Sequence, residues 1–220
     1  MTKIQFITSA LGASLLTGAA CAGVDGFLGY SGEISSYQDF TVIDMYAEFS
    51  SDDYVVLNVF NATITLSDGS GFNHNDLADP QGGSWKPSFS FDIPGAYDSM
   101  ADSYVTIGYG VGADAALNQT ALDPGFGEGN GGLIPEGTAG WFNLTPDNPQ
   151  FAVDGRVKIG HFVFEMELTG SQVFSFGGEI GFNSGPGTDI GFGNDLFVTP
   201  APGALALIGI GGLAARRRRS

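Results

Sequence analysis

The chain has 220 residues with 24 acidic and 8 basic side chains, which give a formal net charge of −16. Five of the basic residues lie in the two end segments, so residues 23–198 hold three cations against 24 carboxylates, a charge of −21. This charge argues against nucleic acid and anionic lipid as partners, since both are bound through Lys and Arg. A hydrophobic content of 43% argues against disorder, because it is enough to build a buried core.

Residues 1–22 have the pattern of a secretory signal peptide. Lys3 supplies a positive start and residues 4–16 supply an apolar stretch. Ala20 and Ala22 then place small residues before a cleavage site that follows residue 22. We therefore expect an exported protein whose mature chain begins at residue 23.

The only cysteine, Cys21, lies inside this segment and raises the alternative of a lipoprotein. Gly18 stands where lipid attachment requires a Leu-like residue, so plain signal-peptide cleavage is favoured. Cleavage after residue 22 leaves a mature chain without cysteine, which has to fold in an oxidising compartment without disulfides.

Residues 23–198 are predicted to form one β-rich domain. The clearest strand covers residues 54–66, where Phe60, Ala62, Ile64 and Leu66 alternate with polar residues and are expected to point inward. Further strands are predicted over residues 41–49, 88–93, 103–109, 156–169 and 172–182. The pattern is typical of an all-β, antiparallel β-sandwich, either jelly-roll-like or immunoglobulin-like.

The segment 156–169 contains a change in the phase of its apolar residues. Val157 and Ile159 are apolar at odd positions, whereas from Phe162 onward the apolar residues (Phe162, Phe164, Met166 and Leu168) are at even positions. The change falls at Gly160-His161 and predicts a β-bulge there. A short link then leads to residues 172–182, so these two segments are predicted to pair as a hairpin. Residues 110–148 and 183–194 are predicted to be loops between or after strands.

Catalytic chemistry has little support in the sequence. The two histidines, His74 and His161, are far apart and are interpreted as ordinary loop and strand residues. Glu165 and Glu167 would lie roughly 6–7 Å apart on one strand face, a spacing that a glycosidase could use. No neighbouring group in the pattern would raise the pKa of one of them, so a solvated strand face is favoured. The chain is predicted not to be an enzyme, and a small hydrolase ranks third among the hypotheses.

Two other sets of residues are candidate binding sites. The first is a loop rich in oxygen ligands, which makes calcium the one candidate cofactor, although ordinary turn chemistry explains the same residues. Its candidate ligands are Asp68, Asn73, Asn75, Asp76 and Asp79. The second set is Trp85 and Trp141, which lie in glycine-rich surroundings and could stack against sugar rings, although partly buried packing is the favoured interpretation.

The C-terminal segment combines an apolar run with a basic end. Residues 203–215 are all apolar or small and would measure about 20 Å as a helix at 1.5 Å per residue. This is short of the ~20 residues that span a bilayer stably, and four arginines follow it at once. The positive-inside rule keeps those arginines on the cytoplasmic side, so the sequence predicts a short membrane helix with the exported domain outside.

The spacing of Pro200 and Pro202, the apolar segment and the arginine cluster together resemble the PEP-CTERM protein-sorting tail of Gram-negative bacteria over residues 199–220. Ala201 stands where the family has Glu. The resemblance implies that Pro200 and Pro202 form a recognition motif for an exosortase, which is a membrane transpeptidase. It also implies a basic stop, made of Arg216, Arg217, Arg218 and Arg219, and a transient stay in the inner membrane before the cell surface or the extracellular space is reached.

Two functional hypotheses follow. In the first, the protein is a non-enzymatic component of the cell surface or extracellular matrix, and its sandwich supplies structure or adhesion. In the second, residues 23–198 are a carbohydrate-binding module for the exopolysaccharide that hosts of such tails produce. A row of exposed tryptophan or tyrosine side chains on one sheet face would favour the second hypothesis.

Overall fold

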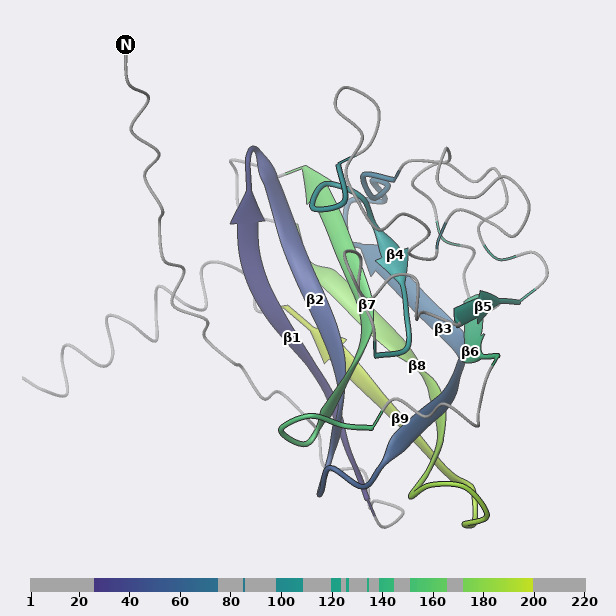
Figure 1. Cartoon of the computed structure of the whole chain (residues 1–220). Helices are drawn as coiled ribbons and strands as arrows, with labels where there is room; N and C mark the ends of the chain where they lie inside the picture. The colour runs from purple at the N-terminus through teal and green to yellow at the C-terminus, as the bar shows by residue number, and fades with distance from the viewer. Residues whose placement is uncertain are drawn as a thin grey trace, which may run out of the picture.

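The computed structural model describes residues 26–74, 85, 98–108, 120–123, 126, 134, 139–144, 151–165 and 172–199. Within these residues all regular structure is β-strand, in two antiparallel sheets (Figure 1). The predicted all-β class is therefore confirmed for the described part of the chain. That part holds no helix long and apolar enough to cross a membrane. Residues 1–22 and 200–220, with the predicted signal peptide, proline motif and arginines, lie outside it.

Each sheet combines strands from both halves of the sequence. Sheet A has the order β1 (Phe27–Tyr37), β2 (Phe40–Phe49), β7 (Arg156–Glu165) and β4 (Tyr104–Val105). Sheet B has the order β5 (Thr120–Leu122), β6 (Ala139–Asn143), β3 (Val55–Leu66), β8 (Phe174–Asn183) and β9 (Gly191–Val198). All strand pairs are antiparallel, and the β1–β2 and β8–β9 pairs each join consecutive strands.

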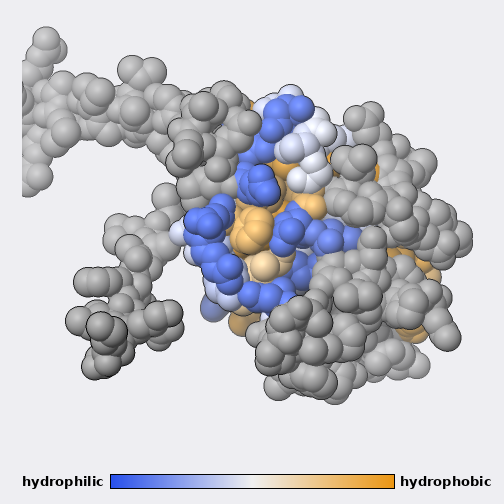
Figure 2. All heavy atoms as spheres, turned by 90° about the horizontal axis from the view of Figure 1, so that it is seen from above, coloured by the Kyte–Doolittle hydropathy of each residue, from blue (hydrophilic) through white to orange (hydrophobic). Residues whose placement is uncertain are grey.

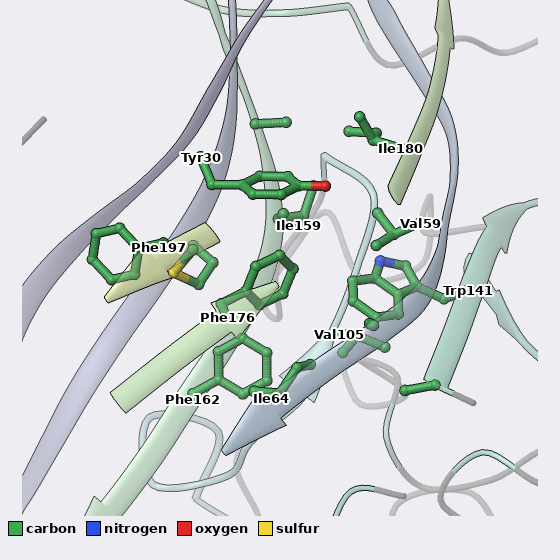
Figure 3. Packing of buried hydrophobic residues seen from close by; sticks show 14 of the residues in the cluster. Tyr30, Val59, Ile64, Val105, Trp141, Ile159, Phe162, Phe176, Ile180 and Phe197 are labelled. Carbon is green, nitrogen blue, oxygen red and sulfur yellow. The ribbon is translucent and has the colours of Figure 1, made fainter. Parts of the chain in front are cut away.

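The inner faces of the two sheets share one hydrophobic core, which makes the fold β-sandwich-like. Figure 3 shows Ile159 and Phe162 from β7 beside Phe176 from β8 and Trp141 from β6. Tyr30 of β1 reaches across this core, and its hydroxyl donates a hydrogen bond to the carbonyl of Gly178 in β8 at 3.1 Å. At the end that carries the β1–β2 turn, the described surface shows hydrophilic residues around a small apolar area (Figure 2). The apolar side chains thus gather between the sheets.

The predicted hairpin between residues 156–169 and 172–182 is wrong. Strand β7 pairs with β2 and β4 in sheet A, whereas β8 pairs with β3 and β9 in sheet B. Both strands present phenylalanines inward, and the rings of Phe162 and Phe174 lie 5.4 Å apart across the core. The chain therefore crosses from one sheet to the other, because this arrangement buries both apolar faces against each other.

The predicted bulge in β7 is confirmed, one residue before its expected place. Tyr46 pairs with Lys158 and Met45 pairs with Gly160, so Ile159 is the extra residue. Val157, Ile159, Phe162 and Phe164 are buried and Glu165 is exposed, as predicted, while Met166, Glu167 and Leu168 lie outside the described residues. Because of the bulge, Lys158 and His161 project from the same outer face although they are three residues apart.

Strand β3 was predicted with the right bounds to within one residue, but its phase changes along its length. Ala62, Ile64 and Leu66 are buried as expected. Phe60 was expected to point inward and instead lies half-buried against Phe192 on the outer face of sheet B. The reason is a bulge, because Asn61 and Ala62 together oppose one residue of β8 and Asn61 takes a left-handed backbone with φ of 52°.

Four strands were not predicted from the sequence. Strand β1 had no predicted counterpart, and β5 and β6 lie inside residues 110–148, which were expected to be loop. Strand β9 begins at Gly191, inside the predicted closing loop 183–194, so the observed loop is confined to residues 184–190. Of the other predicted strands, 41–49 is confirmed as β2, 103–109 is reduced to β4, and 88–93 lies outside the described residues.

Candidate functional site on sheet A

The outer face of sheet A gathers the described cations of this acidic protein. Among the described residues the Lys and Arg side chains are Arg156 and Lys158, and both belong to β7. Asp44 of β2 is paired in register with His161. Its Oδ1 lies 2.6 Å from His161 Nδ1 and 2.7 Å from Lys158 Nζ. The Asp44 carboxylate therefore contacts both Lys158 and His161, because the bulge in β7 places these two side chains on the same face.

His161 is enclosed although it lies on the outer face. Its side chain is only 3% exposed, and its ring stacks on Tyr104 of β4 with centroids 4.9 Å apart. Val42 and Val163 are also buried here, and neither belongs to the main core, so part of the outer face of sheet A is covered. With Nδ1 bonded to Asp44, the Nε2 atom of His161 is buried without a hydrogen-bond partner.

The electrostatics of this cluster favour its charged forms. Burial acts to raise the pKa of Asp44, but the hydrogen bond from His161 and the charge of Lys158 outweigh it and lower this pKa. Burial acts to lower the pKa of Lys158, but its electrostatic interactions with Tyr104 and Asp44 outweigh burial and raise this pKa. Asp44 and Lys158 thus form an ion pair over a wide range of pH.

A second ion pair extends the cluster to β1. Arg156 Nη1 donates to Glu33 Oε1 at 2.6 Å, and its guanidinium lies 4.4 Å from the ring centroid of Tyr46. Together the two ion pairs link β1, β2 and β7. Chemically, Asp44 fixes one nitrogen of His161, and the arrangement holds three strands in register. Among the described residues no three His, Cys, Asp or Glu side chains are grouped to hold a metal.

His74 makes a similar contact on the core side of the molecule. Its Nδ1 lies 3.2 Å from Asp102 Oδ1 and 2.8 Å from the carbonyl oxygen of Ser103, with both side chains almost fully buried. Its ring stacks on the indole of Trp85, with centroids 4.1 Å apart. His74 was interpreted from the sequence as an ordinary loop residue, and the structure places its imidazole inside the fold.

The two tryptophans are packing residues, which the sequence analysis favoured, and the sugar-stacking alternative is corrected. Trp85 is 0% exposed and Trp141 is 1% exposed. Trp141 donates a hydrogen bond from Nε1 to the carbonyl of Thr106 at 3.0 Å, and Phe126 packs between the two indoles. Large aromatic side chains that fill the space between two sheets have no free face for a ligand.

The calcium prediction stays a prediction. Asp68 accepts hydrogen bonds from the backbone and hydroxyl of Ser70 and from the amide of Gln172, which is ordinary turn chemistry. The amide of Asn73 donates to the carbonyl of Ala101. The other three candidate ligands, Asn75, Asp76 and Asp79, lie outside the described residues.

Sequence reasoning missed Asp44 and Tyr104 as partners of His161, and Lys158 as the second partner of Asp44. The phase change in β7 was the available signal, because a bulge brings residues three apart onto one face. The pairing of β7 with β2 was needed as well, and the sequence did not indicate it. No protein-family model, curated protein or solved structure matches the chain.

Proposed function

We propose that this is an exported bacterial protein of the cell surface or extracellular matrix, with a non-enzymatic, structural or adhesive two-sheet domain. An exosortase-type transpeptidase sorts it through the tail at residues 199–220. The observation that carries the proposal is how the chain leaves the domain. Strand β9 pairs with β8 as far as Val198, and Thr199 accepts and donates hydrogen bonds with Phe174.

This arrangement gives the tail a firm attachment to the domain. The apolar segment begins at residue 203, so residues 200–202 are all that separate it from the sheet. Four residue steps span at most about 14 Å when extended. While the apolar segment is in the membrane, the end of β9 is therefore held close to the bilayer, where a membrane transpeptidase acts.

Within this proposal the domain is a jelly-roll-type sandwich. The order β2–β7–β4 in one sheet and β8–β3–β6 in the other pairs early strands with late ones. Such pairing follows when a long antiparallel ribbon folds over into two facing sheets, as a jelly roll does. Strands β1, β5 and β9 then extend the edges of the two sheets.

The test is replacement of Arg216, Arg217, Arg218 and Arg219 by Ser in the full chain, expressed in a Gram-negative host with an exosortase. Each Arg at a helix centre costs about 2.5–3.5 kcal/mol on insertion scales, so four arginines form a strong stop. The variant should still be exported but should lose the membrane-held precursor and any trimming near Pro202. Cell fractionation and mass measurement of the released C-terminus decide this. Retention and trimming like the parent's would refute the sorting role.

A further inference from the structure

The outer face of sheet B exposes apolar side chains along its edge strand. On β9, Phe192 is 54% exposed, Leu196 is 57% exposed and Val198 is 36% exposed. These side chains alternate with inward positions, so they share the outer face. Leu196 and Val198 are next neighbours on this face, and Asn194 separates them from Phe192. Exposed apolar side chains grouped on one sheet face mark a candidate binding surface. We call this surface, with its neighbours on β8 and β3, the β9 face.

Two glycines of β8 make the β9 face flat. Gly181 is paired with Phe192, and Gly177 is paired with Leu196. A Cβ atom at Gly181 would lie 3.6 Å from the Phe192 ring, and one at Gly177 would lie 3.4 Å from Leu196 Cδ1. The apolar side chains of β9 therefore lean over the bare backbone of β8. The ring of Phe192 also meets that of Phe60 from β3 edge to face, with centroids 6.3 Å apart.

Polar side chains lie between the apolar ones. Glu179 of β8 is in register with Asn194 on one side and Phe60 on the other. The amide of Asn61 donates to Glu179 Oε1 at 2.9 Å and holds this carboxylate in place. Asn58 Oδ1 lies over Gly181 beside Phe192, where it is buried beneath the face and has no hydrogen-bond partner. The face thus combines an exposed aromatic ring with fixed amide and carboxylate groups.

Strand addition at the edge of β9 is opposed by Asp195. Its carboxylate accepts a hydrogen bond from the backbone N–H of Tyr30 in β1 at 3.1 Å. A negatively charged side chain therefore lies between the edge strands of the two sheets. Charges placed this way on edge strands hinder pairing with another chain. Face-to-face contact with a second copy is opposed by the charge of −21 that each domain carries.

An anionic partner is disfavoured as well. The described cations, Arg156 and Lys158, lie on sheet A and are paired there with Glu33 and Asp44. The sheet B strands carry no Lys or Arg, so the face offers no cation to a uronate, sulfate or phosphate. The face therefore does not suit an anionic partner, and flat apolar surfaces with many hydroxyl groups would match its apolar and its polar side chains.

We propose that the β9 face binds a neutral polysaccharide chain. Successive pyranose rings of the chain pack their C–H faces on Phe192 and Leu196, which lie four residues apart on β9, and ring hydroxyls bond to Glu179 and Asn194. This inference rests on the adhesive role proposed above and names the ligand class for it. The proposed carbohydrate site is centred on the exposed Phe192, on the outer face of sheet B, and does not involve the buried tryptophans.

The test uses the full chain in mild detergent, with mixed-linkage β-glucan and hydroxyethylcellulose as neutral probes and alginate as an anionic one. In affinity electrophoresis the parent should be retarded by at least one neutral glycan. Phe192→Ser should weaken that binding about tenfold, a loss of about 1.4 kcal/mol. The matched control is Leu28→Ser, because Leu28 is 64% exposed on β1 of the other sheet, and it should bind like the parent. Unchanged melting temperatures show that both variants remain folded.

Several outcomes would overturn the proposal. They are no retardation by either neutral glycan, an equal loss in Leu28→Ser, or binding to alginate alone. Sedimentation velocity adds one more, since a dimer that Phe192→Ser abolishes would assign the face to a second copy. None of these outcomes bears on the sorting role, which the arginine variant tests separately.

Discussion

The outer faces of the two sheets contrast sharply, although their inner faces share one core. On sheet A the outward side chains of β1, β2 and β7 pair with one another through Glu33–Arg156 and Asp44–Lys158. On sheet B three outward side chains of β9, namely Phe192, Leu196 and Val198, are apolar and more than a third exposed. Sheet A therefore uses its outer face to hold its own strands in register. Sheet B has its register set by bulges and inward aromatic residues, which leaves its outer face available to a partner.

The largest loss of stability is expected for a substitution in the core, which both sheets share. Trp141→Ala removes a buried indole that packs on Phe126 and Phe176 and bonds to Thr106. We expect a loss of about 3–5 kcal/mol in the free energy of unfolding, because the two sheets cannot close over so large a cavity. Urea denaturation measures it. A loss below about 1 kcal/mol would mean that the indole is not part of the core.

On sheet A, Asp44→Ala leaves Lys158 and His161 without their shared carboxylate. Removing one partner of a buried pair costs about 3–5 kcal/mol, and we expect about 2–3 kcal/mol here because the Asp44 side chain is 27% exposed. The matched control is Glu33→Ala, since Glu33 is 42% exposed and its pair should contribute less than about 1 kcal/mol. Equal losses in the two variants would contradict the special position of Asp44.

The Asp44 carboxylate should also make the stability of the protein depend on pH in the acidic range. The pKa of Asp44 in the folded protein is below its ordinary value of 3.8. Its contribution to stability is therefore complete above pH 3.8 and is lost as the pH falls through the lower, folded pKa. Between pH 5 and pH 2 (roughly the range of such acid titrations), the parent should lose more stability than Asp44→Asn. Parallel curves for the two proteins would show that Asp44 is not stabilised as an anion.

For Lys158 the dependence of stability on pH has the opposite direction, and it applies at alkaline pH. Its pKa in the folded protein lies above the ordinary 10.5, so its contribution is complete below pH 10.5 and is lost as the pH rises through the folded pKa. Lys158→Met should therefore show a shallower decline in stability above pH 10.5 than the parent. Thermal melting over this range gives the comparison, and an equally steep decline in both proteins would contradict it.

On sheet B, a smaller effect is expected at the bulge of β3. Asn61 has a φ of 52°, which a β-branched residue adopts at a cost of about 1–2 kcal/mol. Asn61→Val should lose about that much, whereas Asn61→Gly should stay within about 0.5 kcal/mol of the parent. Thr63→Val, at an exposed position of the same strand, is the control for the change of side chain. A stable Asn61→Val would mean that the bulge does not set the register of this sheet.

The smallest effect is expected on the β9 face itself. Phe192 and Leu196 are each more than half exposed, so replacing both with Ser should change the free energy of unfolding by less than about 1 kcal/mol. Urea denaturation of the double variant measures this. A loss above about 2 kcal/mol would show that these side chains stabilise the fold and would remove the contrast between the two faces.

Much of the strand content could be predicted because it depends on local alternation. Strands β2, β3, β7 and β8 have regular apolar positions, and the bulge of β7 was visible as a change of parity. The predicted closing loop 183–194 includes the first four residues of β9, because the glycines there and Asn194 resemble turn chemistry when no neighbour is known. Those glycines are instead required by packing, because a Cβ at Gly193 would lie 2.3 Å from the ring of Phe27 in β1.

The candidate site was less predictable than the strands. His161 was noticed, but Asp44 is 117 positions away in sequence, and only the pairing of β2 with β7 brings the two together. For the tryptophans the sequence favoured partly buried packing over sugar stacking, and the structure buries them completely, because two facing sheets need large side chains between them. Phe60 and Phe192 were not expected on the surface, since neither the β3 bulge nor the existence of β9 was recognised.

By itself the sequence determined the β class, the charge of the domain and the positions of four main strands. These properties follow from composition and from the two-residue period of a strand, which neighbouring residues alone express. The tertiary structure decided which strands pair, which aromatic residues are buried and which face of sheet B stays apolar and open. Those choices depend on how two sheets bury their inner faces together, and residues more than a hundred positions apart contribute to that burial.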